Sequence, residues 1–347
     1  MIPIQDTFIP YDTFIERALY HQEGFYEKKE AKIGQAGDFY TSVSISPLFA
    51  QLMALYFIRT SRTYSLPLHI CEIGGGDGSF AKQVCTTIEE HQLEYHYFLV
   101  ERSNQHRDEA AKVLQDFTYC TIYESLEQLM EESDGWEGIV FSNEWLDAQP
   151  VKVLERMRDT FFEIGISEVE GQFQEMKRPA DYLLLDFCNK YQYILPEGFR
   201  LEVPLYMPYY AASLATLLKR GVVATIDYGY THTELQHPAR REGTLRGYQN
   251  HIQYKDYLSN HTSMDLTHHV HWDTWDQACE EVGLINMGRF KQQEFLMEQG
   301  IIEHLQLAST HNPFSEQQKQ NRAIRTFIMG DQLANSFDVS LHQKGIT

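Results

Sequence analysis

The sequence predicts an α/β fold with a mostly parallel, doubly wound sheet. Short apolar stretches with the pattern of strands alternate with longer stretches whose apolar residues recur at helical spacing. A helix between two neighbouring strands implies a right-handed crossover, so the strands run parallel. The strands are expected at 68–73, 95–100, 117–123, 138–142 and 221–228.

The first predicted strand runs into a glycine-rich turn, in the stretch HICEIGGGDGSF at 69–80. Gly74, Gly76 and Gly78 stand at alternate positions, and a helix is expected from about Ser79. Glycine lacks a Cβ and tolerates positive φ, so backbone N–H groups can come close to a ligand there. The first turn of the helix would point further donors at that ligand. Glycine-rich turns also occur in ordinary loops, so the residues around this one must decide what it binds.

The predicted helices separate the strands along the chain. One of them precedes the first strand and begins with Pro47, with Leu48, Phe49 and Leu52 on its buried side. Because this helix lies next to the glycine-rich turn in the chain, it could cover a bound ligand. The other helices are expected at 11–21, 79–91, 104–114, 127–130, 206–219 and 272–282.

From Pro150 the pattern changes to that of an antiparallel insertion. Its strands are expected at 151–154, 160–166 and 169–176. The tight turns that join them are expected near Arg158-Asp159 and Glu170-Gly171. Residues 180–195 have no clear pattern. The polar stretch 231–267 is too long for an idle connection, and we expect it to be functional or partly mobile.

The composition is that of a soluble globular protein. Of the 347 residues, 43% are hydrophobic and 22% charged. A formal net charge of −20 argues against nucleic acid as the main partner and favours a basic protein segment. No apolar run approaches the ~20 residues of a membrane helix, and no targeting signal is visible. We therefore expect a cytoplasmic protein without a membrane partner. The five scattered cysteines form no C-x-x-C pair and predict neither a zinc site nor a disulfide framework.

Acidic residues around the glycine-rich turn indicate the kind of ligand. Glu101 ends the second predicted strand, where nucleoside-binding folds place a carboxylate that accepts hydrogen bonds from ribose hydroxyls. Glu72 and Asp77 make the turn itself negative, which would repel a pyrophosphate. S-adenosylmethionine carries a cationic sulfonium and no phosphate, so it is the favoured cofactor, and NAD is the runner-up.

The fourth predicted strand ends in Asn143 and Glu144, followed by Asp147. Ligands of open α/β sheets bind beyond the carboxyl ends of the strands, so these residues could hold a cationic acceptor. For Asp147, an ordinary role at a helix start is equally plausible. His268, His269 and His271 lie too close together in the chain to share one metal, so no metal is expected, and a surface or capping role is favoured for His268 and His271.

Several segments together resemble the MidA-type methyltransferases, whose mitochondrial member is an assembly factor of respiratory complex I. They appear in family order across residues 18–270: ALYHQEGFY, GDFYTSVSISPLFAQL, EIGGGDGSF, VERS, SNEWLDAQPV, IDYG, GTLRGYQNH and DLTHHV. The resemblance implies a class I, Rossmann-like fold, S-adenosylmethionine as cofactor, and methylation of protein arginine. The chain departs from the family at Gly75 and Asp77 in the turn and between His251 and Asp265, which leaves the acceptor open.

The resemblance also implies roles for individual residues. The cofactor would be lined by Glu72, Gly74, Gly76, Gly78, Glu101, Thr41 and Ser42, with Asp38 and Phe39 beside them. Asn143, Glu144 and His269 are the catalytic candidates. Asp147, Asp227 and Tyr228 would contact the substrate.

We therefore expect a methyltransferase that acts on a protein side chain, arginine being favoured. The alternatives are a small-molecule methyltransferase and a non-catalytic assembly or binding protein, and a homodimer is possible. The expected organisation is an N-terminal helical cap over the cofactor (1–60), a cofactor-binding core (61–149), an inserted antiparallel subdomain for substrate or interface (150–205), and the rest of the core (206–347), which contains a long substrate-side loop (231–267).

Overall fold

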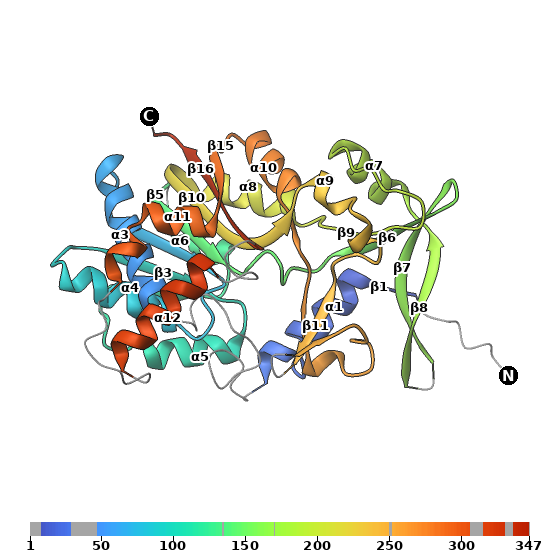
Figure 1. Ribbon diagram of the computed structural model, residues 1–347, viewed down its shortest axis with the longest axis horizontal. Coiled ribbons are helices and arrows are strands. Elements are labelled where there is room, and N and C mark those ends of the chain that lie inside the picture. Colours follow the sequence, from blue (N-terminus) through green and yellow to red (C-terminus); the bar gives the residue numbers. More distant parts are fainter. Residues whose placement is uncertain are drawn as a thin grey trace. The chain divides into compact units, whose positions relative to one another are not determined.

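The computed structural model describes residues 8–28, 47–133, 135–169, 171–249, 252–305, 315–329 and 336–346. The chain divides into two compact units (Figure 1). The antiparallel unit comprises 1–29, 146–211 and 229–278, and the core unit comprises 30–145, 212–228 and 279–347. Both units are discontinuous, because the chain passes between them several times.

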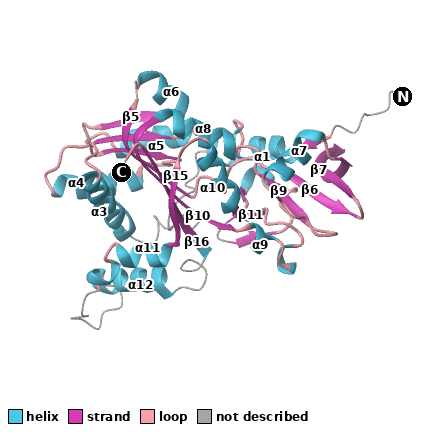
Figure 2. Ribbon diagram, turned by 90° about the horizontal axis from the view of Figure 1, so that it is seen from above, coloured by secondary structure: helices cyan, strands magenta, loops and turns pink. Residues whose placement is uncertain are grey.

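The core unit is built on one sheet with the strand order β15-β16-β10-β5-β2-β3-β4 (Figure 2). Five of its strands are parallel: β2 (His69–Ile73), β3 (His96–Val100), β4 (Cys120–Tyr123), β5 (Trp136–Asn143) and β10 (Leu218–Tyr230). β16 (Phe337–Lys344) runs antiparallel between β10 and β15 (Ile285–Lys291). The expected α/β fold with a mostly parallel sheet is confirmed.

The helices that follow β2, β3 and β4 connect successive parallel strands, as the crossover rule requires, and further helices precede β2 or lie between β15 and β16. They are α3 (Pro47–Thr63), α4 (Ser79–Glu90), α5 (Asn104–Val113), α6 (Leu126–Glu132), α11 (Gln292–Glu298) and α12 (Glu316–Met329), with a short 3-10 turn η4 (Ile301–His304). Serine caps α5 and α6: the Oγ of Ser103 accepts from the N–H of His106 at 3.1 Å, and that of Ser125 from Gln128 at 3.3 Å. Each cap satisfies a backbone donor that the first helical turn leaves free.

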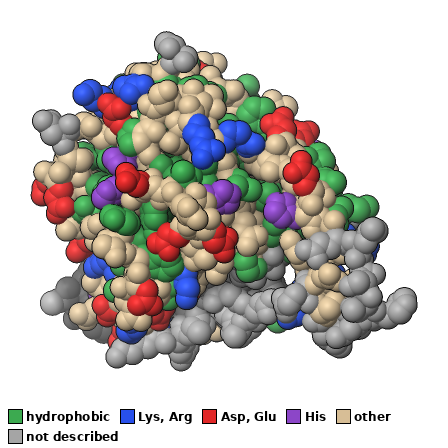
Figure 3. Space-filling model, turned by 90° about the vertical axis from the view of Figure 1, so that its left-hand side faces the viewer, with side chains coloured by type: hydrophobic (Ala, Val, Ile, Leu, Met, Phe, Trp, Pro, Cys, Tyr) green, Lys and Arg blue, Asp and Glu red, His purple; other side chains and the backbone are tan. Residues whose placement is uncertain are grey.

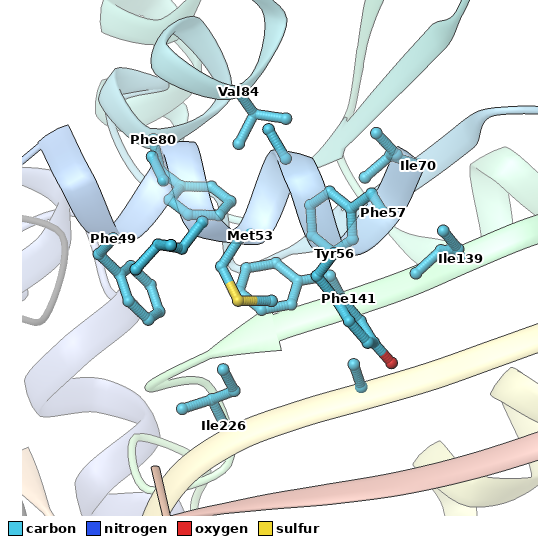
Figure 4. Close-up of a cluster of buried hydrophobic side chains, with 14 of the residues drawn as sticks. Phe49, Met53, Tyr56, Phe57, Ile70, Phe80, Val84, Ile139, Phe141 and Ile226 are labelled. Carbon is cyan, nitrogen blue, oxygen red and sulfur yellow. The ribbon is translucent and has the colours of Figure 1, made fainter. Parts of the chain in front are cut away.

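Aromatic side chains join α3 and α4 to the sheet (Figure 4). Phe57 of α3 and Phe80 of α4 pack against Phe141 of β5, with ring centroids 5.4 and 5.0 Å apart. All three side chains are at most 3% exposed. The glycine-rich turn between β2 and α4 is therefore anchored at both ends in a close-packed core.

The antiparallel unit contains the expected insertion. β6 (Lys152–Met157), β7 (Thr160–Val169) and β8 (Gln172–Pro179) pair antiparallel, and β9 (Arg200–Val203) and β1 (Ile9–Pro10) extend the sheet. Arg158 and Gly171 in the two turns have φ of 55° and 78°, values typical of tight hairpins.

The N-terminal helices belong to different units. α1 (Tyr11–Tyr20), followed by η1 (Phe25–Glu27), lies in the antiparallel unit, whereas α3 lies in the core unit. Phe14, Ile15 and Ala18 of α1 share a buried cluster with Ile164 and Leu266. Residues 1–60 were expected to form one cap, and this cluster is the physical reason for the different grouping.

Two stretches without a clear pattern in the sequence are structured. α7 (Tyr182–Lys190) starts at Asp181, whose Oδ1 accepts from the N–H of Leu184 at 2.8 Å. The expected long loop at 231–267 is wrong for the described residues there. It contains α9 (His232–Leu235), η2 (Pro238–Arg240), η3 (His261–Ser263) and a sheet of β12 (Ile252–Tyr254), β11 (Arg246–Gln249) and β13 (Asp265–Thr267). Strands of this length are too short to show a period.

Three elements complete the fold. α8 (Met207–Leu217) and α10 (Trp272–Glu281) each continue from one unit into the other, and β14 (Val270–His271) pairs with the end of β10. Within the described residues, no helix has the length and apolar character needed to cross a membrane.

Candidate functional site

The glycine-rich turn leaves β2 with its backbone close to neighbouring elements. Gly74 has φ of 72°, and a Cβ there would lie 3.2 Å from the Trp145 ring. Gly78 caps α4 with φ of 78°, and a Cβ there would lie 3.1 Å from the backbone of Ala110 in α5. Glycine is therefore required at both positions for conformation and for space.

Glu101 holds this turn in place. Its Oε2 accepts from the N–H of Gly76 at 2.9 Å and its Oε1 from the N–H of Ser103 at 2.7 Å. The side chain is 8% exposed. A carboxylate has about four acceptor positions, so both oxygens retain capacity for further donors such as ribose hydroxyls. The geometry fits the role expected for Glu101.

Glu72 lies beneath the same turn. It is 5% exposed, and its Oε2 accepts from the hydroxyl of Tyr97 at 2.8 Å. Burial raises the pKa of Glu72 to about 8, with Asp77 and Glu101 adding to the effect. Glu72 is therefore mostly protonated at neutral pH in the free protein. The expected negative charge of the turn falls mainly on Asp77, whose Oδ1 accepts from the N–H of Ser79 at 2.9 Å.

Strand register places several predicted site residues at one edge of the sheet. Ile73 pairs with Ser142 and Ile226 pairs with Asn143. The glycine-rich turn, Asn143-Glu144 and Asp227-Tyr228 therefore lie at or near the carboxyl ends of adjacent parallel strands, where ligands of such sheets bind.

Glu144 has an unusual backbone conformation at this edge. Its φ is 52°, its N–H donates to the carbonyl of Ile226 at 2.9 Å, and its Oε1 accepts from the amide of Asn143 at 3.0 Å. Asp227, on the adjacent strand, is fully buried, while Tyr228 is half-buried. Glu144 is thus the more accessible of the two carboxylates.

In the antiparallel unit, Asp147 is hydrogen-bonded to the residue that precedes His269. The N–H of His268 donates to the carbonyl of Asp147 at 3.0 Å. His269 stacks on the ring of Tyr230, 4.6 Å away and 7° from parallel. Burial, with His268 and nearby arginines, lowers the pKa of His269 to about 3. His269 is therefore neutral at physiological pH and a weak base.

A buried carboxylate that the sequence analysis missed holds these segments. Glu202 of β9 is 2% exposed and accepts from the N–H and Oγ1 of Thr244 and the N–H of Leu245, at 2.9 to 3.1 Å. Thr244 Oγ1 in turn accepts from the N–H of His269 at 3.1 Å. Glu202 stands in a strand of four residues with no motif around it, so no local signal could have identified it.

His268 and His271 lie in the interior of the antiparallel unit. His268 and His271 are 1% and 0% exposed, so the expected surface role is wrong. His268 lies between β13 and β14, His271 is the last residue of β14, which pairs with β10, and His271 Nδ1 lies 2.6 Å from the hydroxyl of Tyr193. No group of three or more potential metal ligands occurs within the described part of the chain. The predicted residues Asp38, Phe39, Thr41 and Ser42 lie outside it.

Comparison with protein families shows the family of this chain. Residues 52–289 match the model of a family described as "Putative S-adenosyl-L-methionine-dependent methyltransferase". The chain belongs to this family. The resemblance seen in the motifs is confirmed, and the cofactor of this methyltransferase family is S-adenosylmethionine rather than NAD.

Two solved structures from Burkholderia thailandensis share the fold over nearly the whole chain. One is bound to S-adenosyl-homocysteine; it is 25% identical, with a TM-score of 0.87, and the match covers 98% of this chain and 89% of that one. The other, of the same superfamily, is also 25% identical, with a TM-score of 0.84 and coverage of 98% and 88%. The class I methyltransferase fold is thereby confirmed.

The described residues fit this cofactor. Gly74, Gly76 and Gly78 give the turn three positions without a side chain, which lets backbone N–H groups come close to a ligand. Glu101 offers carboxylate oxygens at the end of β3, and Glu72 has one described hydrogen bond, from Tyr97. These groups are suited to hydroxyl and amino donors.

Proposed function

We propose that this methyltransferase acts on a protein side chain, with arginine as the leading acceptor. The observation that carries the proposal is the conformation of Glu144 after β5. Non-glycine residues rarely adopt a φ of 52°, and such conformations persist where the surrounding structure holds them, often at active sites. Here the carbonyl of Ile226 and the amide of Asn143 hold the backbone and the carboxylate.

A carboxylate fixed in this way suits a guanidinium group. Arginine presents a planar fork of N–H donors that matches a carboxylate with two parallel hydrogen bonds. The net charge of −20 favours an acceptor within a basic segment. The Burkholderia protein of the same fold binds S-adenosyl-homocysteine, which supports a cofactor of this class for the present chain.

The chain's own residues would orient the acceptor. Bound S-adenosylmethionine supplies the methyl group. Glu144 would hold the guanidinium through its N–H groups so that one nitrogen faces that methyl, and this orientation would provide much of the rate. The nitrogen loses a proton on transfer. Because the pKa of His269 is lowered to about 3, a carboxylate is the better proton acceptor.

The test is incubation with methyl-labelled cofactor against a cellular protein pool and, separately, a metabolite extract. Mass spectrometry should find the label on arginine side chains. Glu144→Gln should lower that labelling at least about tenfold, since one charged hydrogen-bond partner is lost. Glu124→Gln is the matched control, because Glu124 also follows a strand and is exposed.

The other outcomes identify the alternatives. Label in the metabolite extract alone would favour a small-molecule methyltransferase. Absence of cofactor binding would favour a non-catalytic assembly protein. Arginine labelling that Glu144→Gln leaves unchanged would remove Glu144 from the reaction.

A further inference from the structure

A second pocket lies in the core unit, away from the cofactor edge. Its volume is about 410 Å3, and it opens beside the first residues of β2 and β5, His69 and Trp136. The glycine-rich turn follows the other end of β2, five residues on, which is roughly 15 Å at the usual rise per residue. The pocket is therefore distinct from the catalytic edge.

Aromatic rings form its walls. Phe98 lies 6.0 Å from His69, 6.1 Å from Trp136 and 6.3 Å from Tyr123, measured between ring centroids. His69 and Phe98 are partly exposed, although they come from strands of the sheet. Rings at these separations, mostly edge-to-face, offer faces on which a planar cation can stack.

Two carboxylates at the rim of the pocket, Glu137 and Glu132, differ in whether they form an ion pair. Glu137 forms an ion pair with Arg220 at 2.9 Å, and the stem of Lys219 lies beside Gly135. Glu132 accepts from the hydroxyl of Tyr123 at 3.0 Å and has no basic partner within the described residues. Burial and the neighbouring His96 lower the pKa of His69, so His69 adds no positive charge at neutral pH. Figure 3 shows acidic, basic and histidine side chains among apolar ones on the left-hand side of the molecule.

We infer that this pocket binds the guanidinium group of an arginine from a partner protein. Aromatic faces and a carboxylate without a cation are the two features that a guanidinium uses, because it is planar, stacks on rings and donates a fork of hydrogen bonds. An anionic ligand would be repelled by Glu132. The inference does not depend on which molecule accepts the methyl group.

The test is an NMR titration of the full-length protein with N-acetyl-arginine amide. The indole N–H signal of Trp136, assigned with Trp136→Phe, should shift in a saturable way. N-acetyl-citrulline amide, which is similar in shape but uncharged, should bind at least threefold more weakly. Glu132→Gln should weaken binding of the arginine probe at least threefold, whereas Glu131→Gln, an exposed neighbour on α6, should not.

The Glu144→Gln variant separates this pocket from the acceptor site. Binding at Trp136 should be unchanged in that variant. The inference is overturned if the Trp136 signal does not respond, if citrulline binds as well as arginine, or if Glu132→Gln binds as the wild type does.

Discussion

Each unit contains a nearly fully buried glutamate, and the two are held differently. Glu202 in the antiparallel unit accepts from two backbone N–H groups and one hydroxyl. Glu72 in the core unit has one described hydrogen bond, from the Tyr97 hydroxyl, and burial raises its pKa to about 8. A buried carboxylate with full hydrogen bonding organises structure, whereas one with few partners has capacity left for a ligand. We therefore infer an architectural role for Glu202 and propose that Glu72 contacts the cofactor.

The largest expected effect is the pH dependence that Glu72 imposes on stability. Its folded pKa is raised from 4.5 to about 8, so the folded state binds the proton more tightly than the unfolded chain does. The stabilisation of the folded state by this proton is fully present below pH 4.5 and is lost as the pH rises to 8. The free energy of unfolding should fall by up to about 1.4 kcal/mol per pH unit in this window.

Urea unfolding of the wild type and Glu72→Gln at several pH values between 5 and 8 measures this effect. The difference between the two proteins should change steadily with pH, since glutamine does not titrate. Parallel profiles would show that Glu72 is already ionised in the folded protein, and its contrast with Glu202 would disappear.

The second-largest expected effect is the loss of stability on substitution of Glu202. Glu202→Gln should lower the free energy of unfolding by about 3 kcal/mol, because an amide N–H2 then faces the buried donors of Thr244 and Leu245. Cofactor affinity should be unchanged if Glu202 only organises structure. Glu168→Gln, exposed in the same unit, is the control for urea unfolding and calorimetry. A loss of cofactor affinity in Glu202→Gln alone would contradict the assignment.

The sequence predicted those site residues that a local pattern marks, and it could not predict those whose role depends on distant contacts. The glycine-rich turn, Glu101 and Asn143-Glu144 were predictable because each stands at the end of a strand with a clear apolar pattern. The role of Glu202 depends on hydrogen bonds to residues more than 40 positions away, which no local pattern records. The charge of Glu72 could not be predicted either, because its pKa depends on burial.

The fold, like the site, was predictable where local patterns determine it and not where long-range contacts do. The parallel sheet and the hairpins of the insertion were predictable from apolar period and turn residues. The three short strands between Arg246 and Thr267 were not, because pairing with each other rather than local pattern makes them strands. α1 was predicted as a helix, but its place in the antiparallel unit follows from long-range contacts of its buried face.

A smaller effect on stability is expected when Gly78 of the core unit and Gly171 of the antiparallel unit are each replaced by alanine. Both glycines have a φ of 78°. A Cβ at Gly78 would lie 3.1 Å from the backbone of Ala110, whereas a Cβ at Gly171 would have no atom within 4 Å. Both alanine substitutions incur about 1 kcal/mol of backbone strain. Gly78→Ala should cost about 2 kcal/mol more than Gly171→Ala in urea unfolding, because α4 and α5 must separate. Equal costs would show that the close approach of these helices is not tight in solution.

The central claim is that the carboxyl edge of the core unit binds the cofactor through Glu101. Calorimetric titration with S-adenosylhomocysteine tests it most directly, in the wild type, Glu101→Ala and the control Glu90→Ala, an exposed residue at the end of α4, with folding checked by circular dichroism. We expect one bound molecule in the wild type and control, and at least about 100-fold weaker binding in Glu101→Ala. In that variant the ribose hydroxyls and the N–H of Gly76 both lose the carboxylate that accepts their hydrogen bonds. Wild-type affinity in a folded Glu101→Ala variant, or no binding to the wild type, would contradict the claim.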